Sequence, residues 1–385
     1  MRRRGPGSLE RKAPMTAALA GGLGCPNSSL CSRCTAAMLD VLVWKKEIYY
    51  AVASAEDVEP KQKVAVAIYW IDRLKNDPGT MGHTLCICSR PTVTIDNKRY
   101  RFIEKLGEGG FSYVDLVEGI HDGRFYALKR ILCHDRDDRK EALHEVEMHQ
   151  LFDHPNILHL VAHSIVEKGP KWEALLLLPF VKDGSLWNLV EGLRDKNRFL
   201  PEENILQILQ GICKGLKAIH SRGYAHRDLK PTNVLLEDNG RPVLMDLGSM
   251  NKARIEVVNS REAMALQDWA SQRCTISYRA PELFNVESQC VIDERTDIWS
   301  LGCVLFSMMF GEGPYDMIFQ KGDSVALAVQ NNVSIPQSSR YSQELKELLS
   351  ATMTVDPQAR PHISWVLNQV DALLPLTTGQ ATTRI

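Results

Sequence analysis

The chain has 385 residues, and its 46 lysines and arginines nearly balance its 47 aspartates and glutamates. With 44% hydrophobic and 24% charged residues, it has the composition of a globular protein with one large domain or two to three smaller ones. The basic residues are scattered, which argues against a nucleic-acid-binding protein. The apolar runs, such as residues 174–180, are too short to cross a bilayer, and the ten dispersed cysteines indicate reduced thiols rather than a disulfide framework.

Residues 1–80 contain no motif to which we assign a chemistry. Cys25, Cys31 and Cys34 lie close together in this stretch, but a zinc site needs four ligands, and neither a histidine nor a fourth cysteine lies nearby. We therefore expect three thiols without a ligand. The stretch KNDPG at positions 75–79 predicts a turn or linker, because proline and glycine interrupt regular structure.

Regular elements are predicted from about Arg99 onward. Apolar and turn residues predict five strands, over 101–106, 113–118, 125–131, 157–163 and 174–180. Helical periodicity predicts helices over 137–152, 201–221, 294–310 and 342–353. We therefore expect an α+β protein in which a small β-rich lobe precedes a larger helical lobe, with the junction near Phe180.

A glycine-rich stretch, GEGGFSYV at positions 107–114, lies between the first two predicted strands. Glycines allow backbone N–H groups to approach a phosphate closely, although a plain hairpin turn is the alternative. Lys129 lies in the third strand between apolar neighbours, where a charge is costly to bury without a partner. Glu145 of the following helix can supply a carboxylate; otherwise Lys129 is a solvated residue of an edge strand.

The stretch HRDLKPTN at positions 226–233 places a carboxylate, a cation and an amide on one predicted loop. A second carboxylate, Asp246, follows a short apolar run. Phosphoryl transfer needs little covalent help from a protein. It needs bound metal ions, a cation on the phosphates and a carboxylate that orients the attacking hydroxyl. The residue types in these two segments supply each of those parts.

Seven motifs follow one another in a fixed order: the glycine loop, Ala-Leu-Lys ending at Lys129, Glu145, HRD at 226–228, DLG at 246–248, APE at 280–282 and DIWSLG at 297–302. Over roughly residues 99–374, this order and spacing resembles the eukaryotic protein kinases. The resemblance implies the two-lobed kinase fold and transfer of the γ-phosphoryl group of ATP to a protein hydroxyl. A pseudokinase scaffold and a small-molecule kinase are the alternatives. The intact charged motifs argue against the first, and the APE motif and the long activation segment against the second.

The resemblance assigns the catalytic roles residue by residue. Asp228 orients the substrate hydroxyl, and Lys230 neutralises the γ-phosphate. Lys129 holds the α- and β-phosphates and pairs with Glu145.

The resemblance also implies a nucleotide site for ATP and Mg²⁺, with the metal held by Asn233 and Asp246. The residues expected to line that site are Leu106, Gly107, Gly109, Gly110, Val114, Ala127, Lys129, Leu178, Phe180, Asn233 and Asp246.

Further residues have implied structural roles. Glu282 is expected to form a buried ion pair with Arg360. Two positions depart from the commoner kinase pattern, because Ser112 replaces the third loop glycine and Leu247 stands where phenylalanine is commoner. Neither change removes a charged catalytic group.

The KPTN form of the catalytic loop resembles serine/threonine kinases rather than tyrosine kinases. Within the long segment 246–282, apolar residues at helical spacing over 263–270 predict an amphipathic helix, with a disordered loop as the alternative. Such a helix resembles the Numb-associated kinase family.

Three hydroxyls before the APE motif, those of Thr275, Ser277 and Tyr278, are candidate sites of autophosphorylation. Thr275 also lies where serine/threonine kinases place a threonine near the catalytic aspartate and lysine. We expect basic residues such as Arg227 to receive the added phosphate.

Met81-Gly82 has the form of a start methionine followed by an N-myristoylation glycine, and Cys86 and Cys88 lie close enough to carry palmitate. The resemblance implies lipid anchoring of a form starting at Met81, at the cytoplasmic face of intracellular membranes such as the Golgi, with a cytosolic pool. On the residues alone, an internal Met-Gly with idle thiols fits equally well. Protein substrates are the other expected partners.

We therefore expect four regions: an N-terminal extension of unknown role, a lipid-anchor segment, the kinase domain and a C-terminal tail, over 1–80, 81–98, 99–374 and 375–385.

Overall fold

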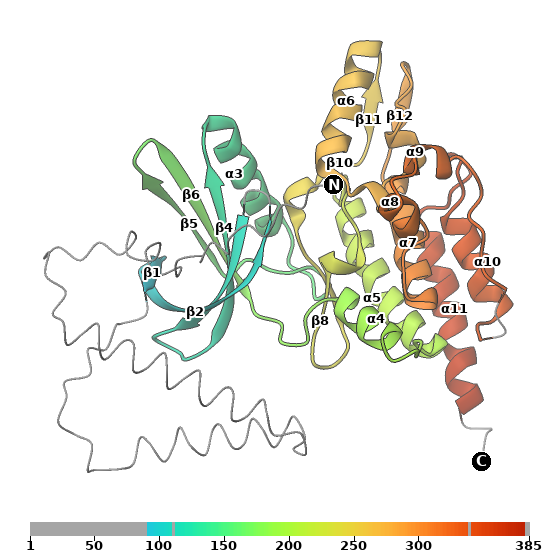
Figure 1. Ribbon diagram of the computed structural model, residues 1–385, viewed down its shortest axis with the longest axis horizontal. Coiled ribbons are helices and arrows are strands. Elements are labelled where there is room, and N and C mark those ends of the chain that lie inside the picture. Colours follow the sequence, from blue (N-terminus) through green and yellow to red (C-terminus); the bar gives the residue numbers. More distant parts are fainter. Residues whose placement is uncertain (1–90, 110–111, 338–339, 382–385) are drawn as a thin grey trace, which may run out of the picture. The chain divides into compact units, whose positions relative to one another are not determined.

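The computed structural model describes residues 91–109, 112–337 and 340–381. It has a small lobe with one large β-sheet and a long helix, followed by a larger lobe of helices (Figure 1). The predicted fold class, a two-lobed kinase fold, is thus confirmed. Gly82, Cys86, Cys88 and Gly110 lie outside the described residues, as does the whole 1–80 region.

The small lobe is built on an antiparallel sheet whose strands run in the order β1-β2-β3-β4-β6-β5. Its elements are β1 Thr92–Ile95, β2 Lys98–Glu108, β3 Ser112–Gly119, β4 Phe125–Cys133, helix α3 Arg136–Leu151, β5 Ala162–Lys168 and β6 Lys171–Pro179. Side chains of β6 alternate between the two faces, as the period of a strand requires. Leu175 and Leu177 join the core on one face, whereas Ala174 and Leu176 pack with α3 on the other.

Two features of this sheet differ from the sequence expectation. β1 pairs with β2 through a turn at Asp96 and Asn97, both with positive φ, so the sheet begins within the range 81–98. The strand expected over 157–163 was placed too early. Ile157 instead forms an isolated bridge with Leu244 of the large lobe and joins its core, because its apolar side chain is buried there.

The large lobe surrounds a fully buried helix, α7. Nearly every residue of α7 is buried, which is typical of a helix that is apolar on all sides. The helices are α4 Leu186–Arg194, α5 Glu202–Ser221, α7 Arg295–Phe310, α8 Asp316–Gln320, α9 Val325–Ala328, α10 Gln343–Thr352 and α11 Ile363–Ala381. The helices expected at 201–221, 294–310 and 342–353 are confirmed to within one residue at each end.

Six short strands belong to the catalytic loop, the metal motif and the segments that follow them. They form three two-stranded ladders: β7 Tyr224–Ala225 with β10 Asn251–Lys252, β8 Val234–Leu236 with β9 Pro242–Leu244, and β11 Ile255–Val257 with β12 Cys290–Ile292. Strand β9 lies directly on α5 because α5 carries glycines there. A Cβ atom at Gly211 would lie 2.4 Å from Pro242, and one at Gly215 would lie 2.9 Å from Leu244.

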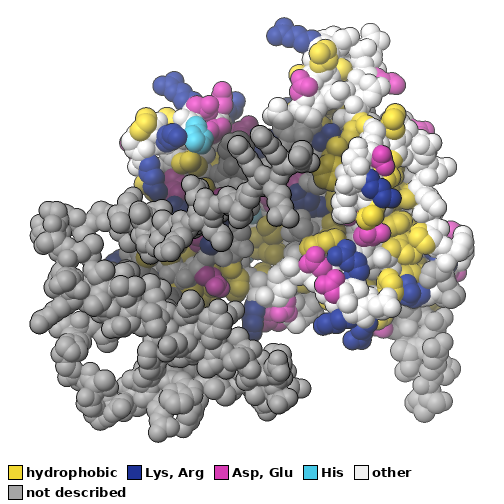
Figure 2. All heavy atoms as spheres, in the orientation of Figure 1, with side chains coloured by type: hydrophobic (Ala, Val, Ile, Leu, Met, Phe, Trp, Pro, Cys, Tyr) yellow, Lys and Arg dark blue, Asp and Glu magenta, His cyan; other side chains and the backbone are white. Residues whose placement is uncertain are grey.

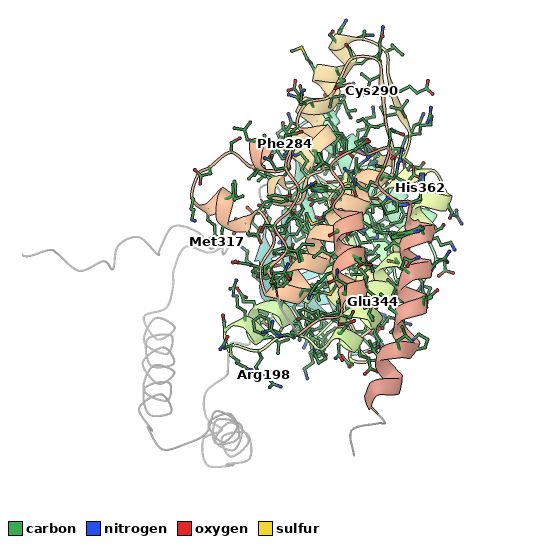
Figure 3. The ribbon with its side chains drawn as sticks, turned by 90° about the vertical axis from the view of Figure 1, so that its right-hand side faces the viewer. Arg198, Phe284, Cys290, Met317, Glu344 and His362 are labelled. Carbon is green, nitrogen blue, oxygen red and sulfur yellow. The ribbon has the colours of Figure 1, made fainter. Side chains whose placement is uncertain are left out.

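The segment between the metal motif and the APE motif contains the predicted helix, α6 Ser260–Arg273. Asn259 caps its first turn by accepting from the backbone N–H of Glu262. Helix α6 and the two-stranded β11–β12 ladder project together from the large lobe, with Cys290 on β12 (Figures 1 and 3). The alternative of a disordered loop is therefore wrong for residues 260–273.

On the face drawn in Figure 2, basic and acidic side chains are interspersed. Among the described residues, no helix is long and apolar enough to cross a membrane.

Candidate active site

The glycine loop is the turn between β2 and β3. Gly107 lies opposite Val114 in the ladder, and the N–H of Gly109 donates to the carbonyl oxygen of Ser112 at 2.7 Å. A Cβ atom at Gly107 would meet nothing within 4 Å, so open space lies beside this backbone. A glycine there leaves that space to a ligand.

Lys129 lies in β4, with its ammonium group between two carboxylates. Its Nζ is 2.7 Å from Glu145 Oε1 and 2.8 Å from Asp246 Oδ1. Burial opposes the charged form, but the attraction of the two carboxylates outweighs it and raises the pKa of Lys129. The expected ion pair with Glu145 is therefore present, and the reading of Lys129 as a solvated edge residue is wrong.

Asp246 reaches Lys129 from an unusual backbone conformation. Its φ of 62° is in the left-handed region, which costs a residue with a Cβ atom some strain. The next residues form a tight turn, η3 Leu247–Ser249, in which Leu247 is buried in the large-lobe core. Gly248 lies against Glu145, where a Cβ atom would be 3.0 Å from Oε2. A side chain at Gly248 would therefore press on the carboxylate of Glu145 at the point where the turn meets α3.

The catalytic loop holds Asp228 from several sides. Lys230 Nζ lies 2.9 Å from Asp228 Oδ2, and Asn233 Nδ2 donates to the same oxygen at 3.1 Å. Thr275 donates to Asp228 Oδ1 through its hydroxyl at 2.7 Å and its backbone N–H at 2.8 Å. Lys230 also donates to the hydroxyl of Thr275 at 2.7 Å, so the expected contact between this threonine and the catalytic aspartate and lysine is present.

Asp297, at the start of α7, supports this loop from beneath. Its carboxylate accepts from the backbone N–H groups of His226 at 2.7 Å and Arg227 at 2.8 Å, and from His220 Nε2 at 2.8 Å. Burial raises the pKa of this carboxyl, but the hydrogen bond from His220 and the nearby positive charges lower it to about 2. Sequence reasoning assigned Asp297 no role, although a carboxylate directly before the apolar pair Ile298-Trp299 was a signal of a buried charge.

The expectation that Arg227 receives a phosphate is not supported by its contacts. Its guanidinium donates five hydrogen bonds, to the side chains of Asn251 and Thr296 and to the carbonyl oxygens of Lys252, Ala253 and Asp293. A guanidinium has five N–H donors, so all of them are used. The residue is also only 3% exposed. Arg227 therefore stabilises the activation segment through these hydrogen bonds, without a phosphate.

The other expected structural ion pair is present. Arg360 forms a two-pronged contact with Glu282, through Nη1 at 2.8 Å and Nη2 at 3.1 Å, and its side chain is fully buried. This pair ties the APE motif to the segment before α11.

A hollow of about 800 Å³ opens between α3, the activation segment and the catalytic loop. It brings together Lys129, Glu145, Asp228 and Asp246, and it extends past Ser112 to the end of α6. The residues expected around the adenine lie outside its lining, on the adjoining strands. Among them, Leu178 lies opposite Ala127 in the ladder and packs in one apolar cluster with it. Leu235 belongs to the same cluster and was missed from the sequence.

The predicted metal ligands suit Mg²⁺ by their chemistry, since both offer oxygen atoms. Asn233 uses its amide nitrogen for Asp228, which leaves its oxygen for a cation. Two carboxylates share the single charge of Lys129, so the cluster has an excess negative charge. Within the described part of the chain, no group of three or more His, Cys, Asp or Glu side chains is arranged to hold a metal ion.

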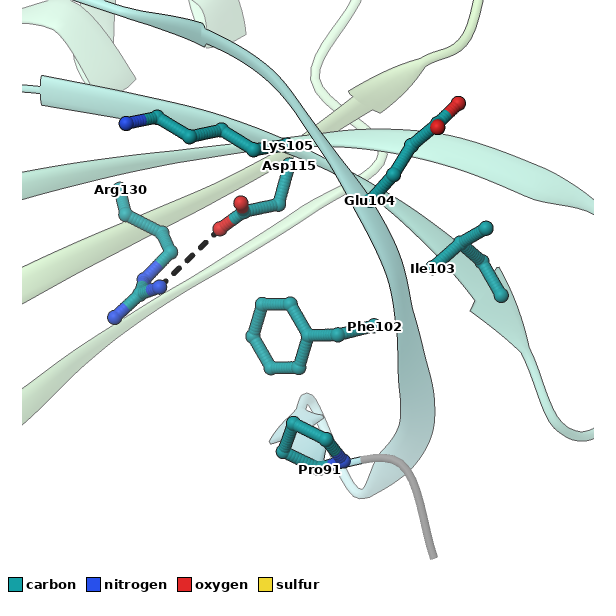
Figure 4. Close-up of a pocket in the computed structure, with 7 residues that line it drawn as sticks. All are labelled: Pro91, Phe102, Ile103, Glu104, Lys105, Asp115 and Arg130. Carbon is teal, nitrogen blue, oxygen red and sulfur yellow. Dashed lines mark hydrogen bonds and ion pairs between the residues drawn. The ribbon is translucent and has the colours of Figure 1, made fainter. Parts of the chain in front are cut away.

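A second hollow, of about 470 Å³, lies on the outer surface of the small-lobe sheet (Figure 4). Arg130 there pairs with Asp115 at 3.2 Å and with Glu173 at 2.7 Å, and it lies over the ring of Phe102. The charges of Arg130, Asp115 and Glu173 are thus paired with one another within the sheet, away from the catalytic groups.

Comparisons with known proteins agree with this geometry. Residues 100–370 match the protein kinase domain family. The chain is 70% identical to serine/threonine-protein kinase 16 of Rattus norvegicus and of Homo sapiens over 305 residues, which cover 79% of this chain and all of each relative. It is 33% identical to serine/threonine-protein kinase ppk13 of Schizosaccharomyces pombe over 315 residues, covering 72% of this chain and 92% of that protein. The chain therefore belongs to the serine/threonine protein kinases.

Proposed function

We propose that this kinase binds ATP with Mg²⁺ and transfers the γ-phosphoryl group through the residues named above. Asp228 orients the attacking serine or threonine hydroxyl, and Lys230 neutralises charge on the transferred group. Lys129, held by Glu145, binds the α- and β-phosphates, and Asn233 and Asp246 hold the metal. Bound Mg²⁺ supplies positive charge to the phosphates.

The observation that carries this proposal is the joint geometry of the charged groups. Lys129 lies within 2.8 Å of both Glu145 and Asp246, while Asp228 is held by Lys230 and Thr275 in the same hollow. A cation is thus positioned for phosphates and a carboxylate for a hydroxyl. The alternative, a catalytically weak scaffold, has no support from these contacts.

Asp228→Asn tests the proposal. Turnover on a protein substrate should fall about 10²- to 10⁴-fold, the usual contribution of a positioned acid–base group, while nucleotide affinity changes little. The matched control is Asp195→Asn, which alters an exposed aspartate after α4 and should keep full turnover. Near-normal turnover of the Asp228 variant would show that the assigned residues do not perform the transfer.

We also propose autophosphorylation in the activation segment, at Thr275, Ser277 or Tyr278. The hydroxyl of Thr275 already lies 2.7 Å from Asp228, which supports a substrate-like position. Ser277 and Tyr278 are buried, so their modification requires local opening of the segment and a second kinase molecule. Mass mapping after incubation with ATP should place phosphate between Asp246 and Glu282. The same incubation of Asp228→Asn should yield none.

A third proposal concerns membrane attachment. We infer that a form starting at Met81 is myristoylated on Gly82 and palmitoylated on Cys86 and Cys88, and works at Golgi membranes with a cytosolic pool. The aligned length of 305 residues equals the length from Met81 to Ile385, which supports that start. One myristoyl chain binds membranes only reversibly, so a second acyl chain is needed for stable anchoring.

We also propose that the chain belongs to the Numb-associated kinase family, because the projecting helix α6 in the activation segment resembles the helix of that family.

Fractionation and imaging test the anchor. In a protein starting at Met81, Gly82→Ala should release the kinase to the cytosol and prevent palmitoylation. Replacing Cys86 and Cys88 by serine should leave weak, diffuse membrane binding. Full membrane retention of the Gly82→Ala protein would assign the anchoring to another surface.

A further inference from the structure

His149 is a buried histidine next to the catalytic ion pair. It lies in the last turn of α3, one helical turn after Glu145, and is 2% exposed. Its Nδ1 is 2.8 Å from the carbonyl oxygen of Leu158. A carbonyl oxygen only accepts, so Nδ1 carries the hydrogen. In the neutral ring, Nε2 is then an acceptor without a hydrogen.

That second nitrogen faces the carboxylate on which Lys129 depends. His149 Nε2 lies 3.9 Å from Glu145 Oε1, the oxygen that accepts from Lys129 at 2.7 Å. Among the described residues, Nε2 has no hydrogen-bond partner. The charged groups that act on the ring are Glu145 of α3, Lys129 of β4 and Asp246 before η3. Burial, the largest effect, lowers the pKa of His149 and keeps the ring neutral.

Packing alone does not explain an imidazole at this position. A leucine or methionine would fill a similar space without burying a nitrogen that lacks a partner. The imidazole can do what an alkyl side chain cannot, because it ties the end of α3 to the backbone at Leu158. Because Nε2 carries no hydrogen, it does not compete with Lys129 as a donor to Glu145 Oε1. A proton on Nε2 would create a second donor for that oxygen, in competition with the lysine.

We propose that His149 is a positioning residue for phosphoryl transfer. Its neutral ring fixes the last turn of α3 on Leu158 and thereby holds Glu145 within reach of Lys129. This inference rests on the proposed roles of Lys129 and Glu145 in binding ATP.

Two substitutions separate this role from packing. His149→Leu removes the donor and should raise the KM for ATP about tenfold, the size of one net hydrogen bond, with a smaller change in kcat. His149→Asn should restore the KM, because the amide nitrogen of asparagine is attached to Cγ, as Nδ1 is. The exposed His159 supplies the control, since His159→Leu should leave KM and kcat unchanged.

A spectrum of the unsubstituted protein provides a second readout. With ¹⁵N-labelled histidine, the His149 signals should show a protonated Nδ1 and an unprotonated Nε2 at neutral pH. An unprotonated Nδ1, or a folded His149→Leu protein with unchanged KM for ATP, would overturn the inference. Either result alongside an inactive Asp228→Asn variant would leave the proposed function standing, whereas an active Asp228→Asn variant would remove it.

Discussion

The catalytic loop and the nucleotide-facing cluster both depend on charged side chains, but the charges are satisfied differently. Arg227 of the loop and Asp297 of α7, which contacts the loop, are buried, and their hydrogen bonds come from the protein itself. In the cluster, Lys129 is shared between Glu145 and Asp246, and Asp246 remains partly exposed in the hollow. The loop is therefore set before any ligand binds, whereas the cluster has a surplus carboxylate that a cation can take up.

The largest effect is expected from breaking the cluster. Lys129→Met removes the only cation between Glu145 and Asp246 among the described contacts, so kcat/KM for ATP should fall about 10²- to 10³-fold. The thermal midpoint should also fall, because the buried carboxylate of Glu145 loses its cation, but less than after removal of Asp297, since the other carboxylate, Asp246, is partly exposed. Steady-state kinetics and calorimetry measure both. Lys98→Met, at an exposed strand position, is the control. A large loss of stability with unchanged kinetics would assign Lys129 to the scaffold.

Breaking the loop should lower the stability more than breaking the cluster does. Asp297→Ala leaves the N–H groups of His226 and Arg227 and the ring of His220 without their acceptor. Removing one side of a buried charged contact costs about 3–5 kcal/mol. The thermal midpoint should therefore drop strongly, and turnover should be lost with the loop geometry. Asp297→Asn retains one acceptor oxygen and should lose less. If both variants melt like the unsubstituted kinase, the loop is held in some other way.

This contrast also explains what the sequence could predict. The lobes, Lys129, Glu145 and the residues of the catalytic loop follow from periodicity and motif order, and so does helix α6. The role of Asp297 and the closed contacts of Arg227 did not follow, because their partners lie up to 77 residues away and many are backbone N–H and carbonyl groups with no sequence signal. The strand misplaced at 157–163 has the same cause, since apolar residues there pack on a different lobe from the one expected.

A pH titration sharpens the account of Asp297 with a smaller effect. Its pKa is lowered from 3.8 to about 2, so its contribution to stability is complete above about pH 4 and is lost as the pH falls toward 2. The shift corresponds to about 2 kcal/mol. Unfolding free energies measured across this window should fall more steeply for the unsubstituted kinase than for Asp297→Asn. Parallel curves would mean that the carboxylate is not held in its charged form by the loop.

The smallest effect is expected from removing phosphate. Since all five N–H donors of the Arg227 guanidinium are used by the protein, this residue has no donor left for a phosphate on the activation segment. A phosphate on Thr275 would also bring negative charge next to Asp228, which its hydroxyl contacts at 2.7 Å. Phosphatase treatment, verified by intact mass, should therefore lower turnover by less than about twofold, or below about 0.5 kcal/mol. Arg227→Leu should reduce stability equally in the treated and untreated kinase. A tenfold loss of turnover on dephosphorylation would instead show that a phosphate completes the active site. The catalytic loop would then depend on an added group, as the nucleotide-facing cluster depends on a cation.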